Sequence, residues 1–314
     1  MKYRVIGLSL LCMLLFIGNP SGVSPTWAST SFTVDSILDE IDSTPGDGAC
    51  LSIPSGVCTL RAALMEANAL TEADTINLPA GVYLLTISGT DENAAATGDL
   101  DINSSVILAG ADASDTIING NQIDRVLQIS GAVSVTLSAV TITGGRPPTN
   151  ISGVNNGGGI SNGGYLSIND SIVSYNETNS AGGGIDNNQA VTLTNSSVLS
   201  NTSAYGASGI LNNATLAVNS SLIAYNHTTN DQGGGLWNNS QATVVGSVIS
   251  DNLAQGSGSA GKNLGVLWFI DSQVSGDVYC LPGSTTYLIR SAVSCSGIGC
   301  IFLNLSVFLP LSMR

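Results

Sequence analysis

The most regular feature of the chain is an alternation of apolar and polar residues that returns about every 25 residues. Four Gly-rich blocks each lead into an aliphatic residue and, two positions later, an asparagine: 157–162, 182–187, 207–212 and 233–238. A second block, Ser-x-Val/Ile-x-x-Asn, ends 17 residues after the third glycine in all four repeats. Most of each repeat therefore has a fixed length, and insertions are expected only in the stretches 177–181, 202–206, 227–232 and 253–258.

A repeat of this length predicts one coil of a solenoid. Two or three short strands rich in β-branched residues, separated by Gly and Asn turns, fill about 25 residues. The repeat is too short for a propeller blade and lacks the helix of an ankyrin or leucine-rich repeat. We therefore predict an all-β fold, a right-handed single-stranded parallel β-helix.

Stacking of such coils places equivalent residues in columns about 4.8 Å apart. Two inward aliphatic columns are expected, Ile160, Ile185, Ile210 and Leu236, and Val173, Val198, Ile223 and Ile249. Two asparagine ladders are expected beside them, Asn162, Asn187, Asn212 and Asn238, and Asn176, Asn201, Asn226 and Asn252. Asparagine suits such bends because it tolerates left-handed backbone angles and bonds to the copy above it.

The remaining pattern divides the chain into four segments. Residues 1–28 have a basic start, a short apolar run and small residues before Ser29, as in a secretory signal peptide cleaved after Ala28. Residues 29–73 form an N-terminal cap, residues 74–300 the β-helix, and residues 301–314 an apolar tail that is too short to span a membrane.

The cap contains one amphipathic helix, predicted over residues 59–68. Leu60, Ala63, Leu64 and Ala67 fall at i, i+3, i+4 and i+7 and so form one apolar stripe. Arg61 and Glu66 are expected outside that stripe. The helix is expected to cover the open N-terminal end of the β-helix, since bare strand edges invite pairing with other chains.

Charge and cysteine content narrow the classes of partner and compartment. The net charge is −14, and removal of Lys2 and Arg4 with the leader makes the mature chain more acidic. Such a chain is repelled by nucleic acid and by anionic lipid. In a secreted protein Cys50 and Cys58 are expected to form a disulfide. The pairing of Cys280, Cys295 and Cys300 stays open.

Three groups of residues are candidates for chemistry. Asp99 and Asp101 lie two apart on one strand face and are the candidate catalytic carboxylates, although solvated turn and surface acids are the favoured interpretation. Asp35, Asp39, Asp42 and Asp47 form an oxygen-rich segment, the candidate calcium site; no other cofactor is expected. Tyr175, Tyr225 and Trp237 are the candidate aromatic strip for sugar stacking.

Other polar residues do not converge in the predicted register. Asp186 shares a column with Ser161, Leu211 and Trp237, whereas Asp251 shares one with Tyr175, Ser200 and Tyr225. No acidic cluster of the kind a calcium-dependent lyase needs is therefore expected in the repeats. His227 lies in a variable stretch near Asp231 without a serine or cysteine partner and is expected to be solvated.

Two stretches resemble known families. Asp47-Gly-Ala-Cys50, followed by Cys58-Thr-Leu-Arg-Ala-Ala63 and Glu66-Ala-Asn68, resembles the CSLREA domain of secreted bacterial β-helix proteins, with Thr59 for the family serine and Ala62 for the glutamate. The Gly-Gly-Gly-Ile blocks resemble the repeats of chlamydial polymorphic outer-membrane proteins. Both resemblances imply the pectin-lyase-like β-helix fold, and fold alone carries no activity.

The sequence favours a secreted or cell-surface protein with a structural, adhesive or glycan-binding role. Polysaccharide or cell-envelope components are the expected partners, with no nucleic acid and no transmembrane helix in the mature chain. A polysaccharide lyase or glycoside hydrolase of the pectin-lyase-like fold is the alternative.

Overall fold

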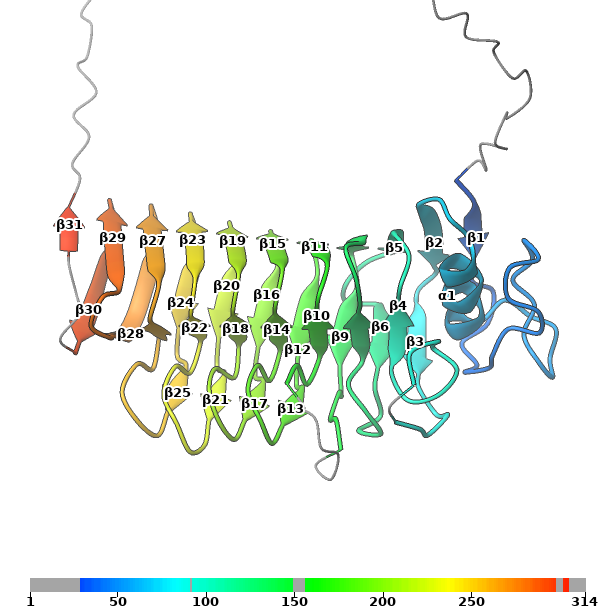
Figure 1. Ribbon diagram of the computed structural model, residues 1–314, viewed down its shortest axis with the longest axis horizontal. Helices are drawn as coiled ribbons and strands as arrows, with labels where there is room; N and C mark the ends of the chain where they lie inside the picture. The colour runs from blue at the N-terminus through cyan, green and yellow to red at the C-terminus, as the bar shows by residue number, and fades with distance from the viewer. Residues whose placement is uncertain (1–28, 91, 149–155, 298–301, 305–314) are drawn as a thin grey trace, which may run out of the picture.

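The chain folds into a rod of stacked coils, seen side-on in Figure 1. The computed structural model describes residues 29–90, 92–148, 156–297 and 302–304. Among them the named strands pair in parallel, and the only helix stands at the N-terminal end of the rod. The predicted right-handed parallel β-helix with a short capping helix is confirmed.

Three sheets run along the rod. The first contains 11 strands in the order β1 (Ser31–Thr33), β2 (Asp74–Leu78), β5 (Val106–Gly110), β8 (Ser134–Ser138), β11 (Tyr165–Asn169), β15 (Ala190–Thr194), β19 (Thr215–Asn219), β23 (Gln241–Val245), β27 (Val266–Ile270), β29 (Thr285–Ile289) and β31 (Phe302–Asn304).

The second sheet consists of two runs that meet at β28 (Gln273–Cys280), which also pairs with β30 (Ala292–Ser296). One run is β3 (Gly81–Leu84), β6 (Thr116–Asn119), β9 (Thr141–Thr143), β12 (Ile172–Ser174), β16 (Ser197–Leu199), β20 (Leu222–Ala224) and β24 (Val248–Ser250). The other run is β4 (Leu100–Ile102), β7 (Leu127–Ile129), β10 (Ile160–Asn162), β14 (Ile185–Asn187), β18 (Ile210–Asn212), β22 (Leu236–Asn238) and β26 (Gly261–Asn263).

The third sheet corrects the expectation that the variable stretches are plain loops. Each of the four begins with a two-residue strand, and these strands pair with one another: β13 (Glu177–Thr178), β17 (Thr202–Ser203), β21 (His227–Thr228) and β25 (Leu253–Ala254). Only the rest of each stretch is irregular. Strand pairing between neighbouring coils continues up to the point at which the coils differ in length.

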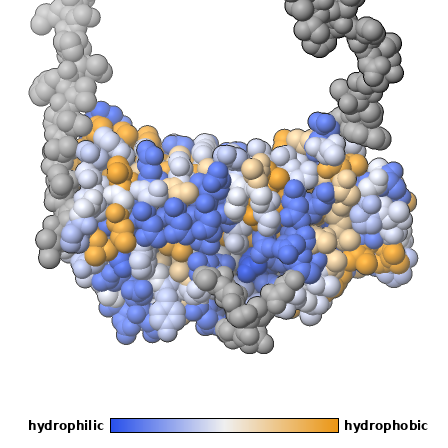
Figure 2. All heavy atoms as spheres, in the orientation of Figure 1, coloured by the Kyte–Doolittle hydropathy of each residue, from blue (hydrophilic) through white to orange (hydrophobic). Residues whose placement is uncertain are grey.

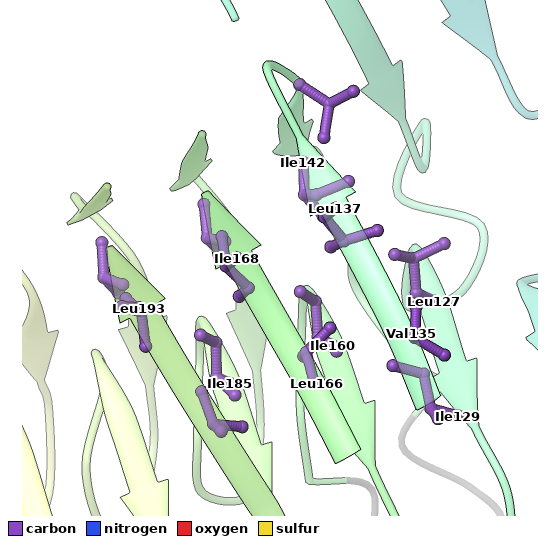
Figure 3. Close-up of a cluster of buried hydrophobic side chains, with 14 of the residues drawn as sticks. Leu127, Ile129, Val135, Leu137, Ile142, Ile160, Leu166, Ile168, Ile185 and Leu193 are labelled. Carbon is purple, nitrogen blue, oxygen red and sulfur yellow. The ribbon is translucent and has the colours of Figure 1, made fainter. Parts of the chain in front are cut away.

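The predicted inward columns are present. Ile160 pairs with Ile185, Ile185 with Ile210 and Ile210 with Leu236, and all four side chains are buried. Val173, Val198, Ile223 and Ile249 form the second column in the same way. Figure 3 shows aliphatic side chains of successive coils facing one another across the rod, so that the core is continuous from coil to coil.

Both asparagine ladders are buried and hydrogen-bonded along the rod. The Nδ2 of Asn187 donates to the Oδ1 of Asn212 at 2.7 Å, and that of Asn201 donates to Asn226 Oδ1 at 3.0 Å. A third ladder, which the sequence analysis missed, links backbone N–H groups to the serine hydroxyls of the next coil, as from Ser196 N to Ser221 Oγ at 3.1 Å. Buried polar groups need such partners, so the ladders fix the stacking register.

The triple glycines serve two separate purposes. The first has a positive φ, +70° at Gly182, which side chains other than glycine rarely adopt. The third lacks room instead, because a Cβ on Gly184 would lie 2.7 Å from the carbonyl oxygen of Gly209 and 2.9 Å from Asn201 Nδ2. The close approach of neighbouring coils, as well as backbone freedom, therefore requires glycine here.

The capping helix α1 spans Leu60–Ala69, one residue later than predicted, and packs against β2 and β4. Thr59 is its N-cap and accepts a hydrogen bond from the backbone N–H of Ala62 at 3.1 Å. Arg61 and Glu66, which were expected outside the apolar stripe, are both buried. Glu66 accepts backbone N–H bonds from Gly46 and Gly48 at 2.6 and 2.5 Å.

The Cys50–Cys58 disulfide is present, with the two Cα atoms 5.0 Å apart. Cys280 is buried, and its sulfur lies 3.4 Å from Thr286 Oγ1. The predicted signal peptide, Cys300 and most of the apolar tail lie outside the described residues. Within the described part of the chain no helix is long and apolar enough to cross a membrane.

Candidate functional site

One column of side chains runs along the outer face of the β4-to-β26 run. Strand register places Asp101, Gln128, Ser161, Asp186, Leu211, Trp237 and Lys262 on successive strands of this column. We call these seven residues the outer column. At about 4.8 Å per strand it extends roughly 29 Å along the rod. The predicted sharing of a column by Asp186, Leu211 and Trp237 is confirmed.

An exposed row of amides borders the middle of the outer column. Trp237 Nε1 donates to Asn239 Oδ1 at 2.7 Å, and Asn239 Nδ2 donates to Asn213 Oδ1 at 2.7 Å. Asn213 Nδ2 donates to Asn188 Oδ1 at 2.9 Å, and Asn188 Nδ2 to Asp186 Oδ2 at 2.8 Å. The three asparagines form what we call the amide row, in which every donor points toward the Asp186 carboxylate.

Next to Trp237 the surface is hollowed. A hollow of about 240 Å³ is lined by Tyr205, Leu211, Trp237 and Asn239, with Ala181, Gly206 and Asp231 at its sides. Tyr205 is 58% exposed. A Cβ on Gly206 would lie 2.8 Å from Ala181 Cβ and 3.3 Å from Trp237 Cε3, so glycine lets this loop lie against the indole.

The Trp237 ring is fixed from the next coil. Lys262 Nζ lies 3.5 Å from the ring centroid, a cation–π contact. Burial lowers the pKa of Lys262, while the nearby Asp231 carboxylate acts in the opposite direction. The indole is thus held by Lys262 and by its own bond to Asn239 before any ligand arrives.

Asp99 and Asp101 lie at the N-terminal end of the outer column, and the interpretation as surface acids is wrong. Asp99 is 5% exposed and Asp101 is 0% exposed. Arg125 Nη1 donates to Asp99 Oδ2 at 3.2 Å and also bonds Gln128, whose Nε2 donates to Asp101 Oδ1 at 3.2 Å. The structure therefore places both carboxylates in one buried polar network.

Burial raises the pKa of both carboxyls. It raises the pKa of Asp99 to about 7, helped by the neighbouring Asp124 and Asp101 charges and opposed by Arg125. It raises the pKa of Asp101 to about 6, opposed chiefly by the backbone N–H of Ala95. A buried carboxylate has lost water that the protein replaces only in part, so the protonated form is favoured.

The segment that covers these carboxylates is tied to the cap. Arg61 is buried, pairs with Asp39 at 2.6 Å and donates to the carbonyl oxygens of Ala95, Gly98 and Asp99. The Asp39 carboxylate in turn accepts the backbone N–H groups of Thr86 and Ile87. The cap, the segment 92–98 and the first coils therefore form one connected unit.

The four candidate calcium ligands hold separate pieces of backbone. Asp35 accepts from Cys58 N, and Asp42 accepts from Thr44 N and Leu51 N. Asp47 accepts from Ala49 N, and Asp39 is engaged by Arg61. No group of three or more His, Cys, Asp or Glu side chains that could hold a metal ion occurs within the described residues.

The three candidate aromatics do not meet. Tyr175 and Tyr225 occupy the turns after β12 and β20, with positive φ angles of 54° and 59° and exposures of 72% and 60%. Trp237 lies on β22, and its aromatic neighbour at the hollow is Tyr205, which the sequence analysis missed. Tyr205 falls in the predicted variable stretch 202–206, and that position was the only sequence signal for it.

Hydrophilic side chains cover much of the middle coils in the view of Figure 2, and hydrophobic ones lie nearer the two ends. No family model and no curated protein match this chain. Among solved structures, pectin methylesterase PemA from Erwinia chrysanthemi is similar in fold. It shares 11% sequence identity at a TM-score of 0.43, over 89% of this chain and 93% of that one.

Proposed function

We propose that this is a secreted, non-catalytic β-helix protein that binds a linear glycan along its outer column. The observation that carries the proposal is the hollow between Tyr205 and Trp237 with the amide row beside it. Aromatic side chains supply large contact area at such sites, while amides fix orientation through hydrogen bonds. The column follows the rod axis, so a linear chain can contact several coils at once.

The energy of binding would come mainly from the aromatic pair. Trp237 is pre-positioned by Lys262 and Asn239, so little side-chain entropy is lost when a ligand binds. The asparagines of the amide row are exposed and spaced one strand apart. Asn188 and Asn239 each keep a donor hydrogen beyond the bond within the row, whereas Asn213 Nδ2 already donates to both Asn188 Oδ1 and Asp186 Oδ1.

Affinity electrophoresis and calorimetry with a panel of soluble polysaccharides test this proposal. For the polymer that binds, we expect Trp237→Ala and Tyr205→Ala each to weaken Kd by about tenfold or more, or about 1.4 kcal/mol. Tyr165→Ala is the matched control, since Tyr165 is 48% exposed but lies on β11, outside the hollow. Loss of binding in Tyr175→Ala or Tyr225→Ala, with binding intact in Trp237→Ala, would contradict the proposed site.

Hydrolysis is the second candidate function, and one observation favours it. Asp99 and Asp101 hold raised pKa values beside Arg125 at one end of the same column, as general acids do. Against it, Asp101 exposes no surface, and Asp99 almost none, to a substrate. Reducing-end release from the bound polymer would support this candidate, and its loss in Asp99→Asn and Asp101→Asn would assign the residues. Binding without turnover would sustain the non-catalytic proposal.

We also propose that the N-terminal module is of the CSLREA type and that the protein acts outside the cell. In support, two residues of the resembling stretch, Arg61 and Glu66, have buried structural roles in the cap. The Cys50–Cys58 disulfide suits an oxidising compartment. N-terminal sequencing of the protein from culture medium is expected to begin at Ser29, and an intact Met1 on intracellular protein would contradict export.

A further inference from the structure

Every lysine and arginine in the described residues is already engaged. Arg61 pairs with Asp39, Arg125 with Asp99, Arg146 with Glu177 and Arg290 with Asp271. Lys262 lies over the Trp237 ring and interacts with Asp231. Recognition of a sugar carboxylate or sulfate normally uses an arginine or lysine aimed at the anion. Along this column each such group has a partner within the protein.

Carboxylates border the outer column where a ligand would lie. Asp186 stands in the column beneath the amide row and is only 4% exposed, and Asp231 lines the hollow, where it interacts with Lys262. The whole chain carries a net charge of −14. A polyanionic chain placed along the column would lie near both carboxylates, and each lysine and arginine among the described residues already has a partner within the protein.

The amide row is complementary to neutral hydroxyl groups rather than to anions. Asn188, Asn213 and Asn239 are exposed and carry amide donors and acceptors, although both donor hydrogens of Asn213 are bonded to Asn188 and Asp186. Hydroxyl groups also donate and accept, so vicinal hydroxyls of a neutral sugar can bond such amides in either direction. A carboxylate only accepts, and it would have to share the row with the Asp186 carboxylate that already receives its last donor.

From these contacts we infer that the glycan bound along the outer column is neutral, and that acidic polysaccharides are excluded by Asp186 and Asp231. This inference rests on the proposed glycan-binding function and adds the chemical class of the ligand. The bound stretch would extend from Asp186 to Trp237, with one sugar stacked in the hollow and its neighbours over the amide row.

Matched polymers that share a backbone and differ in charge test the inference. The full mature chain would be run in affinity gels with hydroxyethyl cellulose and carboxymethyl cellulose, and with methyl-esterified and free polygalacturonate, alongside neutral glucans, mannans, arabinans and galactans. We expect the neutral member of a matched pair to bind at least about tenfold more tightly than the charged one at low salt. We also expect high salt to narrow that ratio.

Variants separate exclusion by these two carboxylates from a general charge effect. The double variant Asp186→Asn with Asp231→Asn is expected to reduce the preference for neutral polymers severalfold, while Asp112→Asn, an exposed acid in the loop before β6, leaves it unchanged. Equal binding of both members of a pair, or binding of charged polymers alone, overturns the inference. Binding of none of the polymers would instead sink the proposed function itself.

Discussion

At the scale of single residues, asparagines of neighbouring coils have opposite roles according to burial. Asn201 is buried, donates to Val173 O and Asn226 Oδ1, and accepts two bonds from Asn176. Asn213 of the amide row is exposed, and its side chain donates to Asn188 Oδ1 and Asp186 Oδ1. The same residue type is thus fixed by folding in the ladder and available to a ligand in the row.

Removal of one ladder asparagine is expected to be costly. Asn201→Ala leaves the backbone N–H and side-chain amide of Asn176 without their acceptor in the core. We expect a loss of about 3 kcal/mol in the free energy of unfolding, measured by urea denaturation. Asn213→Ala is the control and should lose less than about 0.5 kcal/mol. Similar losses in both would contradict the structural role of the ladder.

The buried carboxyls Asp99 and Asp101 predict a pH dependence of stability. Their pKa values of about 7 and about 6 in the folded protein lie above the ordinary 3.8, so folding favours their protonated forms. The contribution of these two carboxyls to the free energy of unfolding is therefore full below about pH 4, and it is lost as the pH rises through about 6 to 7. Compared with the double variant Asp99→Asn with Asp101→Asn, the natural chain should lose up to a few kcal/mol of its free energy of unfolding across that pH range.

The variant comparison cancels the carboxyls whose pKa values are lowered, such as Asp277, because both chains contain them. Urea midpoints at several pH values between about 4 and about 8 give the difference directly. Parallel midpoint curves for the two chains would show that the buried pair does not titrate in this range.

At the scale of elements, the cap depends on one arginine that joins three segments. Arg61 on α1 binds Asp39 through its guanidinium and also the carbonyl oxygens of Ala95 and Gly98. Lysine has no planar fork with which to reach all of these at once. We expect Arg61→Lys to cost about 2–3 kcal/mol of stability by thermal unfolding.

The matched control for this prediction is Arg290→Lys, since the Arg290–Asp271 pair is exposed on both sides. Exposed ion pairs contribute little to stability, so we expect Arg290→Lys to leave the unfolding temperature almost unchanged. A silent Arg61→Lys would mean that the cap is held by α1 packing alone.

The repeating strands could be predicted from the sequence, whereas the non-repeating segments that lie over them could not. The spacing of Ile160, Ile185 and Ile210 determines their column because coils of equal length stack in register. The burial of Asp101 depends on the segment 92–98, whose backbone N–H at Ala95 bonds it and which has no counterpart in the repeats. The meeting of Tyr205 with Trp237 depends on the path of an irregular stretch, which hydrophobic pattern does not encode.

At the scale of the whole molecule, each coil contacts mainly its two neighbours, so stability is expected to be close to a sum over coils. The rod is therefore modular, and its outer column is built one position per coil. Deletion of one complete coil should shorten both the rod and the ligand site, and the remaining coils should keep their structure.

Deletion of residues 176–200 tests this modularity, because it joins Tyr175 to Asn201, which then takes the place that Asn176 holds in its own coil. The shortened protein should keep its strand content by circular dichroism and a cooperative urea transition, with stability lowered by roughly one coil's share. It loses Asp186, Asn188 and Ala181, which lies at the side of the hollow, but keeps Tyr205 and Trp237. Binding of long polymers should therefore survive, and the shortest oligosaccharide that binds should be shorter.

The control is deletion of residues 176–187 alone, which breaks the register between coils and should prevent folding. If this variant folded equally well, the stacking of coils would not depend on their equal length.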